Sequence, residues 1–230
     1  DQFLEYMASQ GVKELILVAQ ETTVYGTDLY GKKTLHILLK KLCQIKGIRW
    51  IRILYCYPEE IYDELIQVMK EEKKICHYLD LPIQHASDRI LRRMGRRTSK
   101  AQLVDIITKL RREIPDIVLR TSLITGFPGE TEEDHQELME FVDEMEFDRL
   151  GVFTYSPEEG TPAETMEGQV PEELKEERRD EIMELQQEIS LEKGDSRIGQ
   201  ELLVMIEGKV SGESAYIGRT YGDAPKVDGY

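Results

Sequence analysis

The sequence predicts an α/β protein in which a partial (β/α) barrel is followed by the start of a small all-β unit. Five short runs rich in β-forming residues alternate with stretches of helical length, and strands separated in this way form a parallel sheet through right-handed crossovers. From Gly199 onward the helical pattern gives way to short alternating runs with glycine turns. These two observations define the fold class.

The strands are predicted in a regular series along the chain. They are residues 14–19, 48–57, 75–84, 117–125 and 149–156. A helix over residues 1–10 precedes the first strand, and Gly11 stands in a C-cap position. Pro58 predicts the start of another helix after the second strand, because proline is favoured in a first helical turn.

Three further helices follow in the second half of the series. They are expected from Ser87, over residues 99–113, and after the fourth strand, where Thr131 and Asp134 have the spacing of a helix N-cap. An open doubly wound sheet and a barrel both fit this order of elements. The barrel is favoured because polar and aromatic residues fall at the carboxyl ends of the strands, which share one mouth in a barrel. These residues are Gln20, Tyr55, Tyr57, Gln84, His85, Thr125, Gly126, Tyr155 and Ser156.

The last third of the chain divides into a loop, a helix and a β unit. Residues 156–168 are a loop by their Pro and Gly content. In the helix predicted over residues 171–193, apolar side chains recur at roughly helical spacing among many charges, which indicates a solvent-facing helix with one narrow apolar stripe. The stripe consists of Leu174, Ile182, Leu185 and Ile189. We therefore expect a partial barrel over residues 1–168, a linking helix over 169–198 and an all-β unit over 199–230 that is truncated.

Composition restricts the partners and the location. The 45 acidic and 30 basic residues give a net charge of −15, which favours a basic protein substrate over a nucleic acid, although charge also serves solubility. Residues 199–230 repeat this bias with five acids and three bases. No apolar run is long enough to span a membrane and no signal core is present, so we expect a cytoplasmic protein without a membrane partner.

The three cysteines are expected to be buried core thiols. Cys43, Cys56 and Cys76 are odd in number, lack CxxC spacing and sit in apolar surroundings. Neither a disulfide framework nor a self-contained metal site follows from such a pattern.

The stretch TSLITGFPGETEED, residues 121–134, ends a predicted strand on a turn with two glycines. Glycine lets a ligand approach the backbone closely because no Cβ stands in the way. A tight strand-to-helix turn without a ligand explains the same residues. Spacing alone leaves both interpretations open.

Three segments in order resemble the methylthiotransferases of the radical S-adenosylmethionine superfamily. They are LPIQHASDRILRRMGR (81–96), SLITGFPGETEED (122–134) and GVFTYSPEEGTPA (151–163). The segments VFTYSPEEGTPA and IGRTYGDAPKVDGY (217–230) are most similar to the group that modifies an aspartate of small-subunit ribosomal protein twelve. This resemblance implies a methylthio group added to the β-carbon of that aspartate, inside a partial (β/α)6 barrel followed by a TRAM β-barrel. The alternatives are a transfer-RNA methylthiotransferase acting on a modified adenosine and a non-catalytic barrel that serves as a binding module.

The resemblance also implies cofactors, partners and site residues. Such enzymes carry two 4Fe-4S clusters and use S-adenosylmethionine, and their partners would be a basic ribosomal protein, the ribosome and an electron-donor protein. Glu21 would complement the ammonium of the cofactor and Arg96 its carboxylate, while the other arginines of residues 89–97 form a solvated helix face. The expected cofactor-binding residues are Gln20, Glu21, Gln84, Arg96, Ser122, Thr125, Gly126, Phe127, Pro128, Gly129 and Tyr155.

The sequence departs from the family pattern at the cluster motif. No CxxxCxxC occurs, and the three cysteines do not match its positions. The cluster cysteines and the first barrel strand are expected upstream of Asp1. We therefore expect no catalytic residue and no metal ligand within this chain, and no radical chemistry by the chain as it stands.

Overall fold

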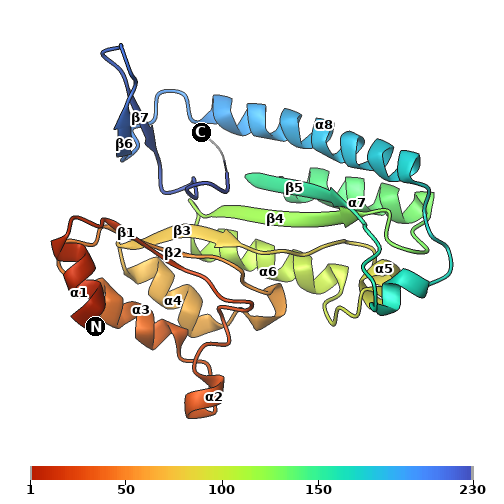
Figure 1. Cartoon of the computed structure of the whole chain (residues 1–230), viewed down its shortest axis with the longest axis horizontal. Helices are drawn as coiled ribbons and strands as arrows, with labels where there is room; N and C mark the ends of the chain where they lie inside the picture. Colours follow the sequence, from red (N-terminus) through yellow and green to blue (C-terminus); the bar gives the residue numbers. More distant parts are fainter. Residues whose placement is uncertain (1, 229–230) are drawn as a thin grey trace.

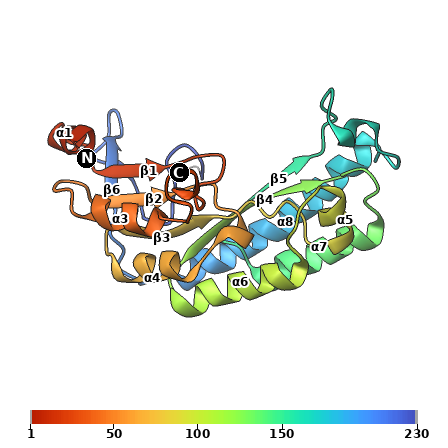
Figure 2. The ribbon, with the colours of Figure 1, turned by 90° about the horizontal axis from the view of Figure 1, so that it is seen from below.

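A five-stranded parallel sheet organises the protein. The computed structural model describes residues 2–228. The strands lie in chain order, with β1 and β5 at the two edges, and every pair is parallel (Figures 1 and 2). They are β1 (Glu14–Leu17), β2 (Trp50–Ile53), β3 (Ile75–Asp80), β4 (Val118–Thr125) and β5 (Arg149–Thr154). All five strands predicted from the sequence are confirmed.

Helices connect the strands and cover the outer face of the sheet. They are α1 (Gln2–Ser9), α2 (Thr27–Tyr30), α3 (Leu35–Cys43), α4 (Asp63–Glu71), α5 (Asp88–Arg93), α6 (Lys100–Glu113), α7 (Glu132–Met145) and α8 (Glu172–Ser196), with short 3-10 helices at Pro58–Glu60 and Pro162–Thr165. The predicted N-cap of α7 is confirmed: Thr131 and Asp134 form a capping box, in which each side chain bonds the backbone N–H of the other. The predicted first helix is present, except that Asp1 lies outside the described residues.

The prediction that Pro58 starts a long helix is wrong. Pro58 opens only a 3-10 turn, after which Ile61 and Tyr62 are extended and α4 begins at Asp63. The physical reason is that the apolar residues of helical period, which α4 buries, begin only at Leu65. Two extended residues are needed to bring that stripe against the sheet.

The two faces of the sheet differ in character. Alternate strand residues such as Ile51, Leu79 and Leu119 point outward and join the main apolar core with side chains of α3, α4, α6, α7 and α8. The residues between them point to the inner face, which is more polar and carries Arg52, Asp80 and Arg120. This alternation is that of barrel strands, in which inward and outward side chains follow each other.

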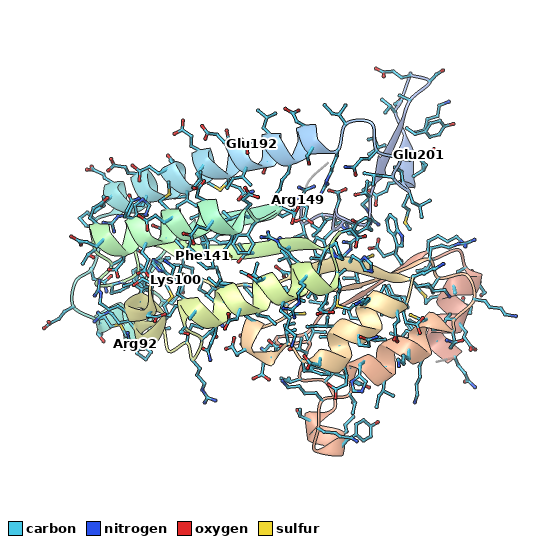
Figure 3. All side chains as sticks on the ribbon, turned by 180° about the vertical axis from the view of Figure 1, so that it is seen from behind. Arg92, Lys100, Phe141, Arg149, Glu192 and Glu201 are labelled. Carbon is cyan, nitrogen blue, oxygen red and sulfur yellow. The ribbon has the colours of Figure 1, made fainter. Side chains whose placement is uncertain are left out.

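Helix α8 lies along β5 and α7 and is more than a solvent-facing link (Figure 1). Ile182 and Ile189 are buried as predicted, and Glu192 on the outer side points away from the sheet (Figure 3). The prediction of an apolar stripe missed that the buried face is largely polar. Its remaining buried members are Lys175, Arg178 and Gln186.

The all-β start predicted after Gly199 is an antiparallel hairpin, β6 (Met205–Lys209) with β7 (Tyr216–Arg219). It lies beside the amino ends of the strands, far from α5 (Figure 1). Residues 219–228, here called the C-terminal strap, then run against the inner face of the sheet, where Ala224 is buried in a cluster with Trp50, Tyr78 and Val118. Where the chain divides into domains stays a prediction.

Ion pairs hold the C-terminal strap in place. Arg219 pairs with Glu14 on β1, and Arg149 on β5 lies 2.5 Å from Asp223. Arg52 donates at 2.6 Å to the carbonyl of Tyr221. The strap therefore fills the inner face near the amino ends of the strands and leaves the carboxyl ends open.

Candidate active site at the carboxyl ends of the strands

The turns that follow β3 and β4 are joined by backbone hydrogen bonds. Gln84 donates its N–H to Ser122 at 3.0 Å and accepts from the N–H of Ile124 at 2.8 Å. Gln84 has a φ of 72°, in the left-handed region that a residue with a side chain adopts at a cost. Ser122 and Ile124 are half-buried on the inner face of β4. The structure thus brings these predicted site residues to one lip of the sheet.

The turn after β4 is built around one buried carboxylate. Glu130 accepts the N–H of Gly126 at 2.9 Å, and Thr125 approaches its other oxygen at 3.4 Å. Burial alone would raise the pKa of Glu130, but the nearby His85 ring, the Gly126 N–H and Arg178 together outweigh it and lower the pKa. The carboxylate is therefore ionised at neutral pH and fixes the shape of the turn.

The glycines of this turn have a packing explanation. Gly126 and Gly129 have φ values of 72° and 85°, and a Cβ on Gly126 would overlap the side-chain stem of Lys175 from α8. A Cβ on Gly129 would lie 2.9 Å from Nε of Arg93. The space beside these glycines is occupied by the protein itself, so only the backbone side of the turn is left for a ligand.

Two arginines of residues 89–97 support the same turn: Arg89 is exposed, as predicted, whereas Arg93 is half-buried, so the prediction of a solvated face was wrong for Arg93. Arg89 donates to the carbonyl of Gly129 at 2.7 Å, and Arg93 donates to that of Pro128 at 2.9 Å. The carbonyls of a glycine turn need hydrogen-bond donors, which explains why both arginines reach this turn. Arg92 and Arg97 are exposed as expected.

Glu21, Tyr57 and Arg96 come together at the opposite lip. Tyr57 donates its N–H to Glu21 at 2.7 Å, and the guanidinium of Arg96 lies 4.8 Å from the centre of the Tyr57 ring. Glu21 also accepts from Thr23. An acid at the backbone of Tyr57 and a base over its ring suit a zwitterion, and the neighbouring Gln20 is exposed in the loop after β1.

Phe127 and Tyr155 lie in a small satellite core. Their rings meet edge to face at 5.2 Å between centroids, beneath the loop that carries Ala163 and Met166. The hydroxyl of Tyr155 is buried and has no hydrogen-bond partner among residues 2–228. Both residues pack the turns that carry the site rather than lining an open surface.

Sequence reasoning placed Tyr55 at the barrel mouth but missed the apolar residues Ile16, Val18 and Phe153. Ile16, Val18, Tyr55 and Phe153 are all more than a third exposed at the carboxyl ends of their strands. Alternation within β1 and β5 was the available signal, because inward positions of an open barrel remain accessible. Apolar walls with a few polar groups are typical of ligand sites.

The three cysteines are buried, as predicted. Burial raises the pKa of the Cys43 thiol to about 11 and that of Cys76 to about 12, and it also raises the pKa of Cys56. Within residues 2–228 no group of three or more His, Cys, Asp or Glu side chains could hold a metal ion. The residues present do not fit an iron–sulfur cluster, whose thiolate ligands must reach the metal.

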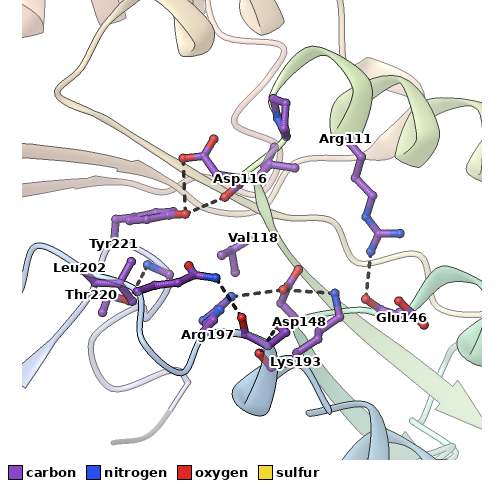
Figure 4. Close-up of a pocket in the computed structure, with 15 residues that line it drawn as sticks. Arg111, Asp116, Val118, Glu146, Asp148, Lys193, Arg197, Leu202, Thr220 and Tyr221 are labelled. Carbon is purple, nitrogen blue, oxygen red and sulfur yellow. Dashed lines mark hydrogen bonds and ion pairs between the residues drawn. The ribbon is translucent and has the colours of Figure 1, made fainter. Parts of the chain in front are cut away.

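A polar cavity of about 490 Å³ lies at the other end of the sheet (Figure 4). The buried carboxylate of Asp148 lies 3.4 Å from Lys193 and 3.5 Å from Arg197, and Arg111 donates to the carbonyl of Glu146. The basic side chains face acidic ones here, so the cavity carries no excess of positive charge for an anion.

No helix in the described part of the chain is long and apolar enough to cross a membrane.

The chain is an open parallel half-barrel with a glycine turn at the carboxyl end of β4. The chain belongs to the radical SAM superfamily, whose family model matches residues 1–142. Two solved structures share this fold at low identity. They are the methyltransferase TsrM from Kitasatospora setae (TM-score 0.52, 15% identity, 66% of this chain and 29% of that one) and Elp3 from Methanocaldococcus infernus (TM-score 0.51, 16% identity, 80% and 47%).

The curated proteins similar to this chain share one name, which is more specific than the superfamily. The chain is 66% identical to the ribosomal protein uS12 methylthiotransferase RimO of Lachnoclostridium phytofermentans over 226 residues. The aligned region covers 98% of this chain and 51% of that protein. The chain is 58% identical over 226 residues to the RimO of Pelotomaculum thermopropionicum, covering 98% of this chain and 51% of that protein, and 56% identical over 223 residues to that of Clostridium perfringens, covering 97% and 50%. The chain spans about half the length of these relatives.

Proposed function

We propose that this chain forms part of a radical S-adenosylmethionine enzyme that adds a methylthio group to the β-carbon of an aspartate in ribosomal protein uS12. The observation that carries the proposal is the 66% identity to such an enzyme over nearly the whole chain. Fold alone would not choose among the many reactions of the superfamily. The aligned region covers 98% of the chain, so it includes the residues at the carboxyl ends of the strands and the hairpin.

The residues of the two lips would hold S-adenosylmethionine by its different parts. Glu21 would accept from the ammonium and Arg96 would bind the carboxylate, since Glu21 contacts the backbone of Tyr57 and Arg96 lies over its ring. Gln84, Ser122 and the backbone of residues 125–129 would contact the nucleoside on the other lip. In the complete enzyme two 4Fe-4S clusters, held by ligands outside this chain, would supply the one-electron chemistry and the sulfur step.

The substrate would be a basic protein, on the ribosome or free of it. The net charge of −15 and the acid excess of residues 199–230 attract basic chains and repel RNA phosphates. The hairpin lies at the amino ends of the strands, and α8 leads to it over 25 residues, or about 37 Å at 1.5 Å per residue. The hairpin would therefore bind the substrate at a distance from the reacting aspartate. A cytoplasmic location and an electron-donor protein follow from this reaction.

The test uses the protein at the full length of its relatives, reconstituted anaerobically with iron and sulfide and supplied with reductant and S-adenosylmethionine. Intact-mass spectrometry then follows uS12 and transfer RNA in parallel. A methylthio mass gain on uS12 is the expected result. A gain on transfer RNA would replace the proposed substrate, and failure to cleave S-adenosylmethionine would leave a binding module.

A further inference from the structure

Two buried basic residues connect α8 with the turns at the mouth. Arg178 donates to Glu130 at 2.9 Å, and the two side chains are only 4% and 0% exposed. The same carboxylate accepts the N–H of Gly126. A cation on α8 is therefore linked through a single acid to the backbone of the turn after β4.

Lys175, nearly one turn earlier on α8, reaches both neighbouring turns. Its ammonium donates to the carbonyl of Tyr155 at 2.8 Å, and its stem fills the space beside Gly126. Few other side chains could do both, because the position needs a thin apolar stem and a donor at its tip. The carboxyl ends of β4 and β5 are thus both fastened to this helix.

The turn after β3 joins the same network through His85. Ser87 donates its N–H to Nδ1 of His85 at 3.0 Å, so the proton of the neutral ring is on Nε2. Nε2 lies 3.3 Å from Glu130, although the alignment is too poor for a full hydrogen bond. Removing Arg178 would leave Glu130 buried with only this weak partner, Thr125 and one backbone N–H, which an ionised carboxylate does not tolerate without rearrangement.

We infer that Arg178 is a positioning residue, which acts through Glu130 to hold residues 125–130 in the conformation that binds S-adenosylmethionine. The inference rests on the proposed function. On this inference α8 has two roles. The helix leads to the hairpin, and through Arg178 it also determines the affinity of residues 125–130 for the cofactor. Coupling of this kind requires that Arg178 favour one state of the turn over others.

The experiment compares variants of the full-length reconstituted protein by two measurements. Equilibrium dialysis gives the Kd for S-adenosylmethionine, and hydrogen exchange followed by mass spectrometry reports on residues 124–130. For Arg178→Met we expect a Kd raised by about tenfold or more and faster exchange in the turn, the effect of leaving a buried charge without its partner. Arg178→Lys keeps the charge and should recover the Kd to within about threefold.

Ile189→Ala is the matched control. Ile189 is buried in the main core on the same helix, about three turns further on, so its truncation loosens the docking of α8 without touching Glu130. We expect it to lower the Tm while the Kd stays within about twofold. An equal rise in Kd for Ile189→Ala and Arg178→Met would overturn the positioning role, as would an unchanged Kd for Arg178→Met. Absence of binding by the unmodified protein would instead defeat the proposed function, and this inference with it.

Discussion

Tyr78 on β3 donates a hydrogen bond of 2.8 Å to the carboxylate of Asp228, which lies 150 residues further along the chain. Arg120 on β4 completes the arrangement, at 3.2 Å from Asp228 and 2.7 Å from Asp80. The C-terminal strap therefore belongs to the inner face of the sheet as much as the strands do. Charges that would be costly there in isolation are paired across three segments of the chain.

Arg120→Met should be among the most destabilising single changes on the inner face. It leaves Asp80 and Asp228 buried without their cation, and breaking a buried ion pair from one side costs about 3–5 kcal/mol. Tyr78→Phe removes one hydrogen bond only and should cost about 1–3 kcal/mol. Urea unfolding measures both. Equal losses would mean that the carboxylates find other partners.

Gly126→Ala should destabilise the protein by more than its backbone conformation explains. The φ of 72° already costs about 1 kcal/mol for alanine, and the added methyl group must displace the stem of Lys175. Gly160→Ala is the control, since Gly160 has a φ of 80° and nothing within 4 Å of the added Cβ. Thermal unfolding of both variants separates the two effects, and an identical shift in Tm would rule out the packing role of Lys175.

Gln84→Gly should separate stability from ligand binding. Glycine adopts the φ of 72° without strain but gains freedom in the unfolded chain, so the free energy of unfolding should change by less than about 1 kcal/mol. If the Gln84 amide contacts the cofactor, the Kd for S-adenosylmethionine rises several-fold. Calorimetry and equilibrium dialysis on the same preparation test this, and unchanged affinity would remove Gln84 from the proposed site.

Asp134 predicts a loss of stability in acid. Burial alone would raise its pKa, but hydrogen bonds from Arg89, Ser87 and Thr131 outweigh burial and hold the pKa well below its ordinary value. A depressed pKa gives stability that is present above the unfolded value, about 3.9, and is lost as the pH falls below it. Asp134→Asn should therefore be less stable at pH 7 yet show a flatter decline between about pH 5 and 2. Parallel curves for the two proteins would contradict this.

The sequence predicted the elements well because each has a local signal. Strand runs, the Thr131 and Asp134 cap, and the change of pattern at Gly199 all depend on neighbours within a few residues. Convergence of the carboxyl ends could also be predicted, because parallel strands end at the same edge of the sheet. Whether the predicted residues there bind the cofactor stays a prediction.

Long-range ion pairs could not be predicted in this way. Lone charges inside apolar runs, at Arg52, Asp80 and Arg120, signalled that partners must exist, but nothing in a single sequence identifies them. Gly126 shows a related limit: its positive φ was foreseeable from the turn, but the close approach of α8 was not. The polar side of α8 was interpreted as solvated for the same reason, because Lys175 and Arg178 resemble surface residues until their acceptors are known.

The C-terminal strap also constrains how the protein folds in time. Arg219 and Glu14 are 205 residues apart, and Arg52 and Tyr221 are 169 apart. Contacts between residues so far apart form slowly, because the entropy of closing a long loop is lost before the contact can stabilise the structure. Helices and neighbouring strands should assemble first, leaving the charged inner face hydrated. Docking of the strap would then be the late, rate-limiting event that expels water from the half-barrel.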